Sequence, residues 1–531
     1  MPILLRNLAL NPGESEGLLL EQLLARFSLG RDEVSSWRIV RKGIDARKKP
    51  RIKFVYTIEF TLADEAGFGQ RYGGDADLEI VTEMAEPIFI KLDSAKRIIV
   101  AGSGPAGLFA ALRLSEYGLT PAILERGRPM AERVRDVQSF WSTGALDVES
   151  NVQFGEGGAG TFSDGKLTTR VRDRNIGYVL TKLVQFGAPQ EILSLAKPHI
   201  GTDRLREVVT NIRLHLESAD IPIRFREKLS DIVANGGHVR GVVVNGRFEY
   251  PCDILVVAPG HSARDTYRML HDRGVVLEQK PFSIGVRVEH PQEVINRIQY
   301  GHPSQPTLPP AEYALAYNNA RTGRSAYSFC MCPGGVVVAG ASEEGGVVTN
   351  GMSNHLRNSP YANSALVVGV GRGDFAGESP LAGIEFQRLW ERKAFETGGK
   401  NYRAPAQNLL AFLGEKGVKR VSSTYRPGVQ EADLSQALPG FVTETLREGI
   451  RFFDRKMRGF VTAEATLTGV ETRTSAPVRI VRGDDFQSVS LQGLYPAGEG
   501  AGYAGGIMSA ALDGIRVADA IAEKLQAKRN H

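Results

Sequence analysis

Two glycine-rich segments, far apart in the chain, have the residue spacing that most directly suggests chemistry. The first follows the run 97–101, which is apolar after Arg97, and reads GSGPAG at 102–107. In this GxGxxG pattern the first glycine permits a tight turn, the second lets the backbone approach a pyrophosphate, and the third lets a helix pack closely on a strand. The helix that follows offers free N–H groups to the phosphate. The residues expected to form this phosphate-binding turn are Gly102, Ser103, Gly104, Pro105, Ala106 and Gly107.

An acidic residue completes this first unit. Glu125 ends the next apolar run, 121–124, and Arg126 follows it. A carboxylate at that position can accept hydrogen bonds from both hydroxyls of an adenosine ribose. A glycine turn alone is a weak signal, but strand, turn, helix, strand and acid occur here in order. The segment therefore predicts a Rossmann-like dinucleotide site, with Glu125 and Arg126 among its binding residues.

The second glycine-rich segment lies near the end of the chain. It reads GLYPAGEGAGYAGGIM at 493–508 and leads into another apolar helix. The N–H groups of that helix are expected to face the pyrimidine edge of a flavin, where the reduced ring carries negative charge. Glu499 is placed to bind ribityl or phosphate-side hydroxyls. Together the two segments predict non-covalently bound FAD, and the second is expected to contact it through Gly498, Glu499, Gly505, Gly506, Ile507 and Met508.

Two stretches between these motifs are also expected at the cofactor. The run 254–260, after Asp253, is apolar and ends in Ala-x-Gly, as does a buried parallel strand that meets a dinucleotide. The glycine-dense segment 151–167 is either a cofactor loop or a flexible surface loop, and its bulky Phe154, Phe162 and Leu167 favour the first interpretation. The residues expected to contribute are Gly157, Gly158, Thr161, Ser163, Ala258 and Gly260.

Bulk properties limit the class of protein. A chain of 531 residues with a hydrophobic fraction of 42% should form two or three domains with sizeable cores. The net charge of +5 does not indicate a polyanionic partner, and three cysteines exclude a disulfide framework. No run of about 18 apolar residues predicts a membrane span, and residues 1–6 do not resemble the start of a secretory signal. We therefore expect a soluble cytoplasmic protein, with no metal site and an undetermined oligomeric state.

Residues 1–94 are expected to form a small separate domain. A β-α-β-β order, typical of a ferredoxin-like module, follows from the apolar patterns at 3–10, 14–29, 34–42 and 51–62. The basic stretch 41–51 lies between the last two patterns. It is either a solvated hairpin or a contact for nucleic acid or an acidic partner. No aromatic platform with RNA-binding spacing accompanies it, so nucleic acid is not the favoured partner.

The sequence patterns after residue 94 predict an α/β fold of the two-dinucleotide, glutathione-reductase-like flavoprotein type. A Rossmann-like FAD domain is expected over 95–270, completed by a closing strand and helix in 481–531. Residues 271–480 contain strand patterns separated by long loops and are expected to form an interleaved α+β substrate domain. Residues 367–373 are glycine-rich but lack the GxGxxG-helix-acid order, so we interpret them as a loop rather than a second nucleotide site.

Two pairs of residues in the interleaved domain are candidates for catalysis. Cys330 and Cys332 would share a face of a strand, with sulfurs too far apart to bond without distortion. They are either redox-active or nucleophilic thiols or two small buried residues. Arg473 could hold a substrate carboxylate or phosphate, and Glu471 could orient it.

Two histidines are further candidates. His199, and His261 beside the Ala-x-Gly turn, could each act as an acid or a base. A single histidine is as readily a structural hydrogen-bonding residue, and that alternative stays open for both.

Longer motifs indicate a family. The segments NVQFGEGGAGTFSDGKL from Asn151, GHSARDT from Gly260, YSFCMCPGG from Tyr327 and LTGVETRTSAPV from Leu467 resemble the predicted FAD-dependent dehydrogenases of bacteria, a group of NAD(P)/FAD-dependent oxidoreductases. The resemblance covers almost the whole chain. It implies a small N-terminal domain, an FAD domain and an interleaved second domain, but it supplies no substrate.

These observations predict an FAD-dependent oxidoreductase. A small-molecule substrate would deliver hydride to flavin N5 in a cleft between the FAD domain and residues 271–480. NAD(P)H could serve as a transient reductant, and a quinone or a partner protein as the electron acceptor. Two alternatives stay open: a flavin-dependent RNA-modifying or RNA-binding enzyme, and a non-catalytic flavoprotein that acts as a redox sensor or partner module.

Overall fold

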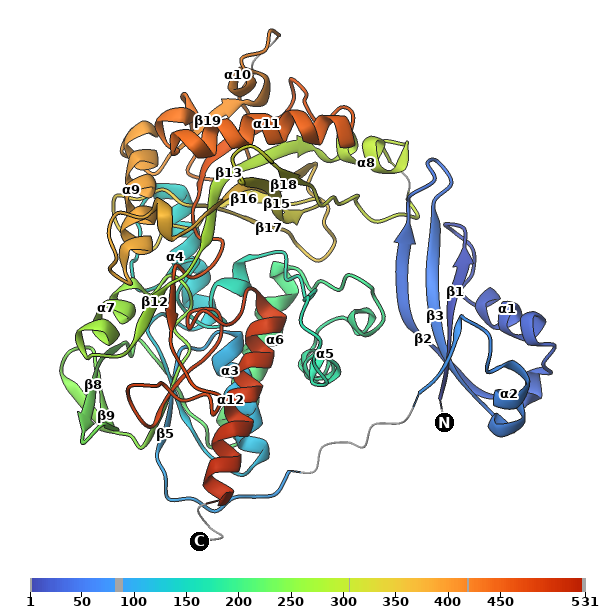
Figure 1. Cartoon of the computed structure of the whole chain (residues 1–531), viewed down its shortest axis with the longest axis horizontal. Coiled ribbons are helices and arrows are strands. Elements are labelled where there is room, and N and C mark those ends of the chain that lie inside the picture. Colours follow the sequence, from blue (N-terminus) through green and yellow to red (C-terminus); the bar gives the residue numbers. More distant parts are fainter. Residues whose placement is uncertain (1, 82–88, 305, 418–419, 528–531) are drawn as a thin grey trace.

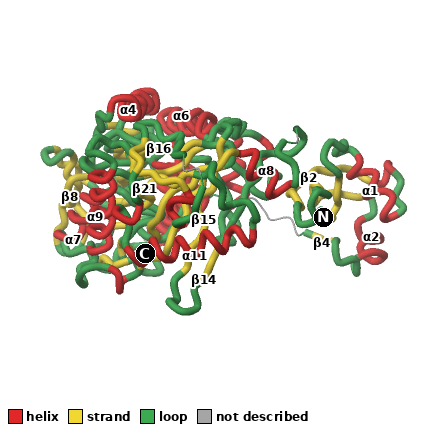
Figure 2. The backbone as a smooth tube through the Cα atoms, turned by 90° about the horizontal axis from the view of Figure 1, so that it is seen from above, coloured by secondary structure: helices red, strands yellow, loops and turns green. Residues whose placement is uncertain are grey.

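A small N-terminal domain lies to one side of a larger body in the computed structural model (Figures 1 and 2), which describes residues 2–81, 89–304, 306–417 and 420–527. The small domain consists of β1 (Ile3–Leu10), α1 (Leu18–Phe27), β2 (Val34–Asp45), β3 (Lys53–Leu62), α2 (Glu65–Tyr72) and β4 (Leu78–Ile80). Its antiparallel sheet has the order β2-β3-β1-β4. The β-α-β-β order that the apolar patterns predict is present, and α2 and β4 follow it without having been predicted.

The hairpin between β2 and β3 carries the basic stretch and contacts the larger body. The backbone of Lys42 exchanges hydrogen bonds with Ser194 and Ala196, at 2.7 and 2.8 Å. The Lys42 ammonium lies 2.7 Å from Glu16, and Arg47 pairs with Asp45. Acceptors within the chain therefore satisfy part of the basic stretch, which gives no support to the RNA-binding alternative.

A five-stranded parallel sheet forms the centre of the larger body. It consists of β5 (Ile98–Ala101), β6 (Ala122–Glu125), β7 (Ile223–Phe225), β11 (Ile254–Val257) and β23 (Leu494–Pro496), in the order β23-β11-β5-β6-β7. Its strands are short, apolar and mostly buried, as expected of a parallel sheet covered on both faces. β11 lies between β5 and β23, so the two glycine-rich turns leave the same end of one sheet.

Helices and a small sheet surround this centre. The helices are α3 (Pro105–Glu116), α4 (Met130–Thr143), α5 (Ile176–Gln185), α6 (Thr202–Ser218), α7 (Arg264–Asp272) and α12 (Ile507–Ala527). α12 packs alongside α3 (Figure 1), which joins the last segment of the chain to the first motif. An antiparallel sheet beside the centre is built from β8 (Leu229–Asn235), β9 (His238–Val244) and β10 (Phe248–Pro251).

The interleaved domain is built on a seven-stranded sheet. Its order is β14 (Ala316–Asn318), β15 (Ser325–Cys332), β18 (Tyr361–Val370), β13 (Phe282–Pro291), β21 (Thr466–Glu471), β19 (Ala404–Asn408) and β20 (Val429–Glu431). Its helices are α8 (Gln292–Tyr300), α9 (Ala382–Thr397), α10 (Leu409–Leu413) and α11 (Gly440–Lys456). A two-stranded sheet of β16 (Val336–Ala339) and β17 (Thr349–Met352) completes it. Where the chain enters and leaves this domain, β12 (Leu277–Gln279) pairs with β22 (Val478–Ile480).

The loop prediction for residues 367–373 is wrong over its first half. Residues 367–370 end β18, a central strand of the seven-stranded sheet, and Gly369 pairs with Ser283 of β13. Valines on either side of a glycine are compatible with a strand that is buried on both faces. The spacing of the glycines had suggested a loop instead. Separately, no helix in the described residues is long and apolar enough to cross a membrane.

Candidate functional site

A cavity of about 400 Å³ lies where the carboxyl ends of β5, β11 and β23 meet the sheet of the interleaved domain. Ligands of open α/β sheets bind at this end of the strands. Residues from all of the predicted cofactor segments line it, namely Gly102, Gly104, Pro105, Ala106, Glu125, Arg126, Gly158, Ser163, Ala258, Gly260, Glu499, Gly505, Gly506 and Ile507. The structure therefore brings together segments that are almost 400 residues apart in the chain.

Six predicted cofactor residues lie behind the lining of the cavity. They are Ser103, Gly107, Gly157, Thr161, Gly498 and Met508. The Gly157 N–H donates to the Ser103 carbonyl at 3.1 Å, and the Thr161 hydroxyl donates to the Glu156 carbonyl at 3.3 Å. A Cβ on Gly107 would collide with the Gly102 carbonyl, so glycine is needed there for packing. These residues hold the lining segments in place.

Glu125 is bonded more fully than its sequence position predicts. One carboxylate oxygen accepts from the N–H and the hydroxyl of Ser103, at 3.0 and 2.7 Å. The other accepts from the N–H groups of Gly127 and Gly155, at 2.9 and 3.0 Å. A carboxylate has about four lone-pair positions. Its first role in this structure is therefore to hold the glycine turn against the 151–167 loop, and a ribose would share an acceptor that is already in use.

Arg133 organises the same loop, and the sequence analysis missed it. Its fully buried guanidinium donates to four backbone carbonyls, those of Asn151, Val152, Gly155 and Glu156, at 2.9, 3.0, 3.3 and 2.6 Å. Burial lowers the pKa of Arg133 to about 10. Because one side chain satisfies four carbonyls of an irregular segment, Arg133 fixes the conformation of the loop.

The glycines of the lining fit a dinucleotide. A Cβ on Gly104 would find only the Gly158 Cα within 4 Å, at 3.8 Å, and its φ of −75° suits any residue. Packing of the described chain thus does not require glycine at this position, which faces the cavity at the N-terminus of α3. Gly505 and Gly506 are similarly open at the N-terminus of α12. Bare backbone at two helix N-termini is suited to a pyrophosphate and to an anionic ring edge.

Glu499 lines the cavity close to the second of these helix N-termini. Burial raises its pKa to about 7, against the opposing effects of the Gly506 N–H and the Lys280 ammonium. A carboxyl that titrates near neutral pH can either donate or accept a hydrogen bond. This suits the hydroxyl-binding role that the sequence predicts.

Comparison with known proteins agrees with this geometry. Residues 97–161 match the family described as "FAD binding domain", and residues 281–474 match "FAD-dependent protein, C-terminal domain-like". Residues 2–61 match a domain of unknown function. An uncharacterised protein of Clostridium beijerinckii is 46% identical over 530 residues, which is 99% of both chains. The chain belongs to the same family of FAD-dependent proteins. FAD is therefore its cofactor.

The solved structures that match this chain are more distant. Glycerol-3-phosphate dehydrogenase from Bacillus halodurans, complexed with FAD, is 12% identical with a TM-score of 0.35, over 81% of this chain and 65% of that one. A geranylgeranyl bacteriochlorophyll reductase-like protein from Thermoplasma acidophilum is 14% identical with a TM-score of 0.36, over 82% and 79%.

The opposite wall of the cavity comes from the interleaved domain of this FAD-dependent protein. Phe329, Cys330, Asn350, Glu471 and Arg473 line it. Of the six candidate catalytic residues, four line the cavity, namely Cys330, Glu471, Arg473 and His261. Cys332 is fully buried next to Cys330, and His199 does not line the cavity.

The expected pairing of Glu471 with Arg473 is wrong. Glu471 instead forms a bidentate ion pair with Arg287, with both N–O distances at 3.0 Å. Arg287 is fully buried and also donates to the Cys330 carbonyl and the Asn363 side chain, each at 2.9 Å. The sequence analysis missed Arg287, whose signal is a lone charge inside the apolar run 282–288.

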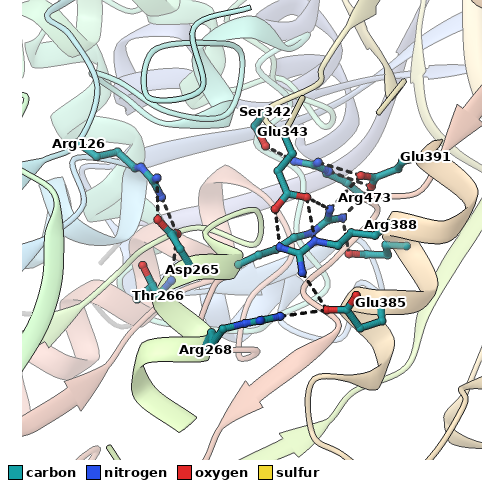
Figure 3. A network of polar contacts seen from close by, with 12 residues as sticks. Arg126, Asp265, Thr266, Arg268, Ser342, Glu343, Glu385, Arg388, Glu391 and Arg473 are labelled. Carbon is teal, nitrogen blue, oxygen red and sulfur yellow. Dashed lines mark hydrogen bonds and ion pairs between the residues drawn. The ribbon is translucent and has the colours of Figure 1, made fainter. Parts of the chain in front are cut away.

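Arg473 belongs to a buried network that joins the two domains (Figure 3). Its Nε and one Nη donate to Glu391 at 3.1 Å each, and its other Nη donates to Ser342 at 2.5 Å. Glu391 also accepts from Arg264 of the FAD domain, at 2.7 and 2.9 Å. Arg264 and Arg388 share Glu343, which lies at 2.5 and 2.6 Å from them. The Arg473 donors are thus engaged within the protein. Its main role in this structure is to join the two domains, and the predicted binding of a substrate anion is secondary.

The two histidines have different surroundings. The Nε2 of His199 lies 3.0 Å from the His355 carbonyl, and its ring stacks on that of His355. His199 does not line the cavity, so this arrangement suits the structural alternative. His261 lines the cavity, and its Nδ1 lies 2.9 Å from the Ser262 hydroxyl. Burial, with Arg473 and Arg264 nearby, lowers the pKa of His261 to about 3, so its imidazole stays neutral at physiological pH.

Proposed function

We propose that this protein is an FAD-dependent oxidoreductase that oxidises a small organic molecule. The observation that carries the proposal is the shared cavity, which the two glycine motifs form on one side and the interleaved domain on the other. When bound, FAD would supply a two-electron acceptor at N5 for the hydride of a substrate C–H bond, as in the oxidation of a CH–OH or CH–NH unit. The substrate would lie against Phe329 and Asn350, which line the cavity on the side of the interleaved domain.

The residues around the proposed substrate position have separate tasks. Phe329, with 38% of its surface exposed, offers an apolar face for the substrate and excludes water. The neutral imidazole of His261 can orient a substrate by donating or accepting one hydrogen bond. Asn350 accepts from Arg287 at 3.2 Å, so the buried Arg287–Glu471 pair fixes its amide. The wall is therefore rigid before substrate binds, which lowers the cost of orienting it.

The electron acceptor is a separate question. A quinone or a partner protein could reoxidise the flavin, and NAD(P)H could reduce it transiently. The proposal needs only that a small molecule and FAD meet in one cavity.

The first test concerns the cofactor site. Gly104→Ala adds one methyl group where the protein has space but where a pyrophosphate would lie, and Gly373→Ala adds one at an open position far from the cavity. We expect Gly104→Ala to weaken FAD binding at least tenfold while the melting temperature of the FAD-free protein is unchanged, and Gly373→Ala to change neither. Equal FAD affinity in both variants would contradict the proposed site.

The second test concerns the reaction. The FAD-loaded protein is mixed without oxygen with NADH, with NADPH, and with panels of small amines and hydroxy acids, while the flavin absorbance near 450 nm is followed. We expect at least one organic donor to bleach the band at a rate that saturates with its concentration. A band that dithionite bleaches normally but no donor does would contradict the oxidoreductase and favour the non-catalytic alternative.

A further inference from the structure

We propose that Cys330 and Cys332 form a redox-active dithiol that exchanges two electrons with the FAD of the same cavity. The inference rests on FAD binding there, as the proposed function does, but not on the identity of any substrate. It assigns a role to the two thiols, which the reaction proposed above does not use.

A β-bulge interrupts β15 at the two cysteines, so the spacing of a regular strand does not apply to them. Between Phe329 and Cys332 the strand advances three residues while its partner β18 advances two, from Ala365 to Asn363. Cys330 has a φ of 44°, in the left-handed region that residues other than glycine rarely adopt. In an extended strand, Cα atoms two residues apart are separated by about 6.6 Å, near the upper limit for a disulfide. Bulges redirect side chains, and here Cys330 and Met331 stand opposite a single residue of β18, Ser364.

The two thiols are placed unequally. Cys330 lines the cavity, whereas Cys332 is fully buried behind it. The Cys332 Sγ turns back toward Cys330 and lies 3.4 Å from its carbonyl oxygen. One thiol can therefore meet a cofactor or a substrate, and the other can meet only its neighbour.

Two cations lie beside the pair. Arg287 donates to the Cys330 carbonyl at 2.9 Å, and the Lys166 ammonium donates to the Met331 carbonyl. A hydrogen bond from the Cys332 thiol, together with these two charges, outweighs burial and lowers the pKa of Cys330 to about 5. The hydrogen bond to Cys330, burial and the negative charge of Cys330 raise the pKa of Cys332, against the opposing effect of the Lys166 ammonium. At neutral pH the pair is therefore one thiolate in the cavity and one thiol behind it, and the thiolate is the reactive form.

Electrons and atoms balance for this pair. The Cys330 thiolate and the Cys332 thiol lose two electrons and one proton as the S–S bond forms. The oxidised FAD takes up both electrons and the proton and becomes the anionic reduced flavin. The overall change conserves one negative charge and needs no further reagent. In the reverse direction, reduced FAD opens the disulfide.

Cys252 provides the contrast within the chain. It is fully buried in the core, its thiol donates to the Ile254 carbonyl at 3.0 Å, and burial raises its pKa to about 12. It has the surroundings of an inert structural cysteine. Cys330 differs in its cavity position, its neighbouring cations and its partner thiol.

The test is a count of electrons. The FAD-loaded protein is oxidised with diamide, freed of reagent and titrated with dithionite without oxygen. We expect the wild type and Cys252→Ser to consume four electrons for each FAD, and Cys330→Ser and Cys332→Ser to consume two. Two electrons in the wild type would overturn the proposal. If FAD itself did not bind, there would be no flavin band to titrate, so failure of the proposed function is distinguishable.

A labelling experiment on the wild type requires no variant to fold. Iodoacetamide is added in short pulses across a pH range, and peptides are analysed by mass spectrometry. We expect Cys330 to be labelled with a midpoint below pH 7, and Cys252 to stay unlabelled. After diamide the peptide containing Cys330 and Cys332 should lose 2 Da and resist labelling. Full labelling of Cys330 after diamide would contradict the disulfide.

Discussion

Gly514 of α12 packs directly against the backbone carbonyl of Ala106 in α3, so the closing helix rests on the first glycine motif. A Cβ added to Gly514 would lie well under 3.0 Å from that oxygen, a separation that real Cβ atoms do not show. Ala106 also lines the cofactor cavity. The position of α12 therefore affects the shape of the cavity at Ala106, which lies more than 400 residues earlier in the chain.

Gly514→Ala should separate the two helices. A rigid backbone oxygen cannot yield as a flexible side chain would, so we expect unfolding in urea to require about 1–3 kcal/mol less free energy and FAD affinity to fall. Gly177→Ala is the matched control, because Gly177 lies in α5 and its Cβ would meet open space in the described structure. That variant should be unchanged or up to about 1 kcal/mol more stable. A neutral Gly514→Ala would mean that the helices are less closely packed than described.

The sequence predicted the cofactor half of the site because its signals are local. A turn, the helix after it and the acid that ends the next strand lie within about 30 residues, and each fixes its own conformation. The closing motif could be placed because it also consists of a strand, a glycine-rich turn and a helix. Residues on the cavity lining and residues just behind it were not distinguished, since both kinds favour glycine.

The charged pairs of the second half could not be predicted in the same way. Glu471 and Arg473 are neighbours in sequence, yet they bond to Arg287 and Glu391, which lie 184 and 82 residues away. Only the tertiary fold sets such pairings. The signal that could have identified such residues is a charged side chain at a position where the pattern expects an apolar one. Arg133 is an example, because it lies on the buried face of α4 between Met130 and Val137.

Arg133→Met should release the glycine loop. The variant keeps the volume of the side chain but leaves four buried carbonyls without their shared donor, which we expect to cost about 3 kcal/mol or more of stability. FAD affinity should fall at least tenfold because the loop lines the cavity. Arg135→Met, at an exposed position two residues along the same helix, is the control and should change neither. Urea unfolding and flavin fluorescence titration measure both effects, and normal FAD affinity in Arg133→Met would contradict the role assigned to this residue.

Glu499 predicts how the stability of the FAD-free protein depends on pH. Its folded pKa of about 7 lies above its usual value of 4.5. The carboxyl is protonated in both states below pH 4.5 and ionised in both above about pH 7. Between these values the folded state holds the proton more tightly, so its stabilising effect is lost as pH rises. Relative to Glu499→Gln, the wild type should lose on the order of 3 kcal/mol across this window.

Thermal unfolding of the two FAD-free proteins between pH 4.5 and 8 measures that loss. Glu378→Gln, at an exposed position, is the control for the loss of a carboxyl from the surface. A difference between Glu499→Gln and the wild type that does not change with pH would contradict the raised pKa of Glu499.

The Arg287–Glu471 pair should behave as a unit. Both residues are buried, so Arg287→Met leaves the Glu471 carboxylate without its partner, and we expect a loss of about 3–5 kcal/mol. The double variant Arg287→Met/Glu471→Met removes both charges together. Its loss should be smaller than the sum of the single losses by about 1–3 kcal/mol. The exposed pair Arg38–Glu59 of the N-terminal domain is the control, where a coupling below about 1 kcal/mol is expected. Additive losses at Arg287 and Glu471 would show that the two side chains contribute independently to the cavity wall.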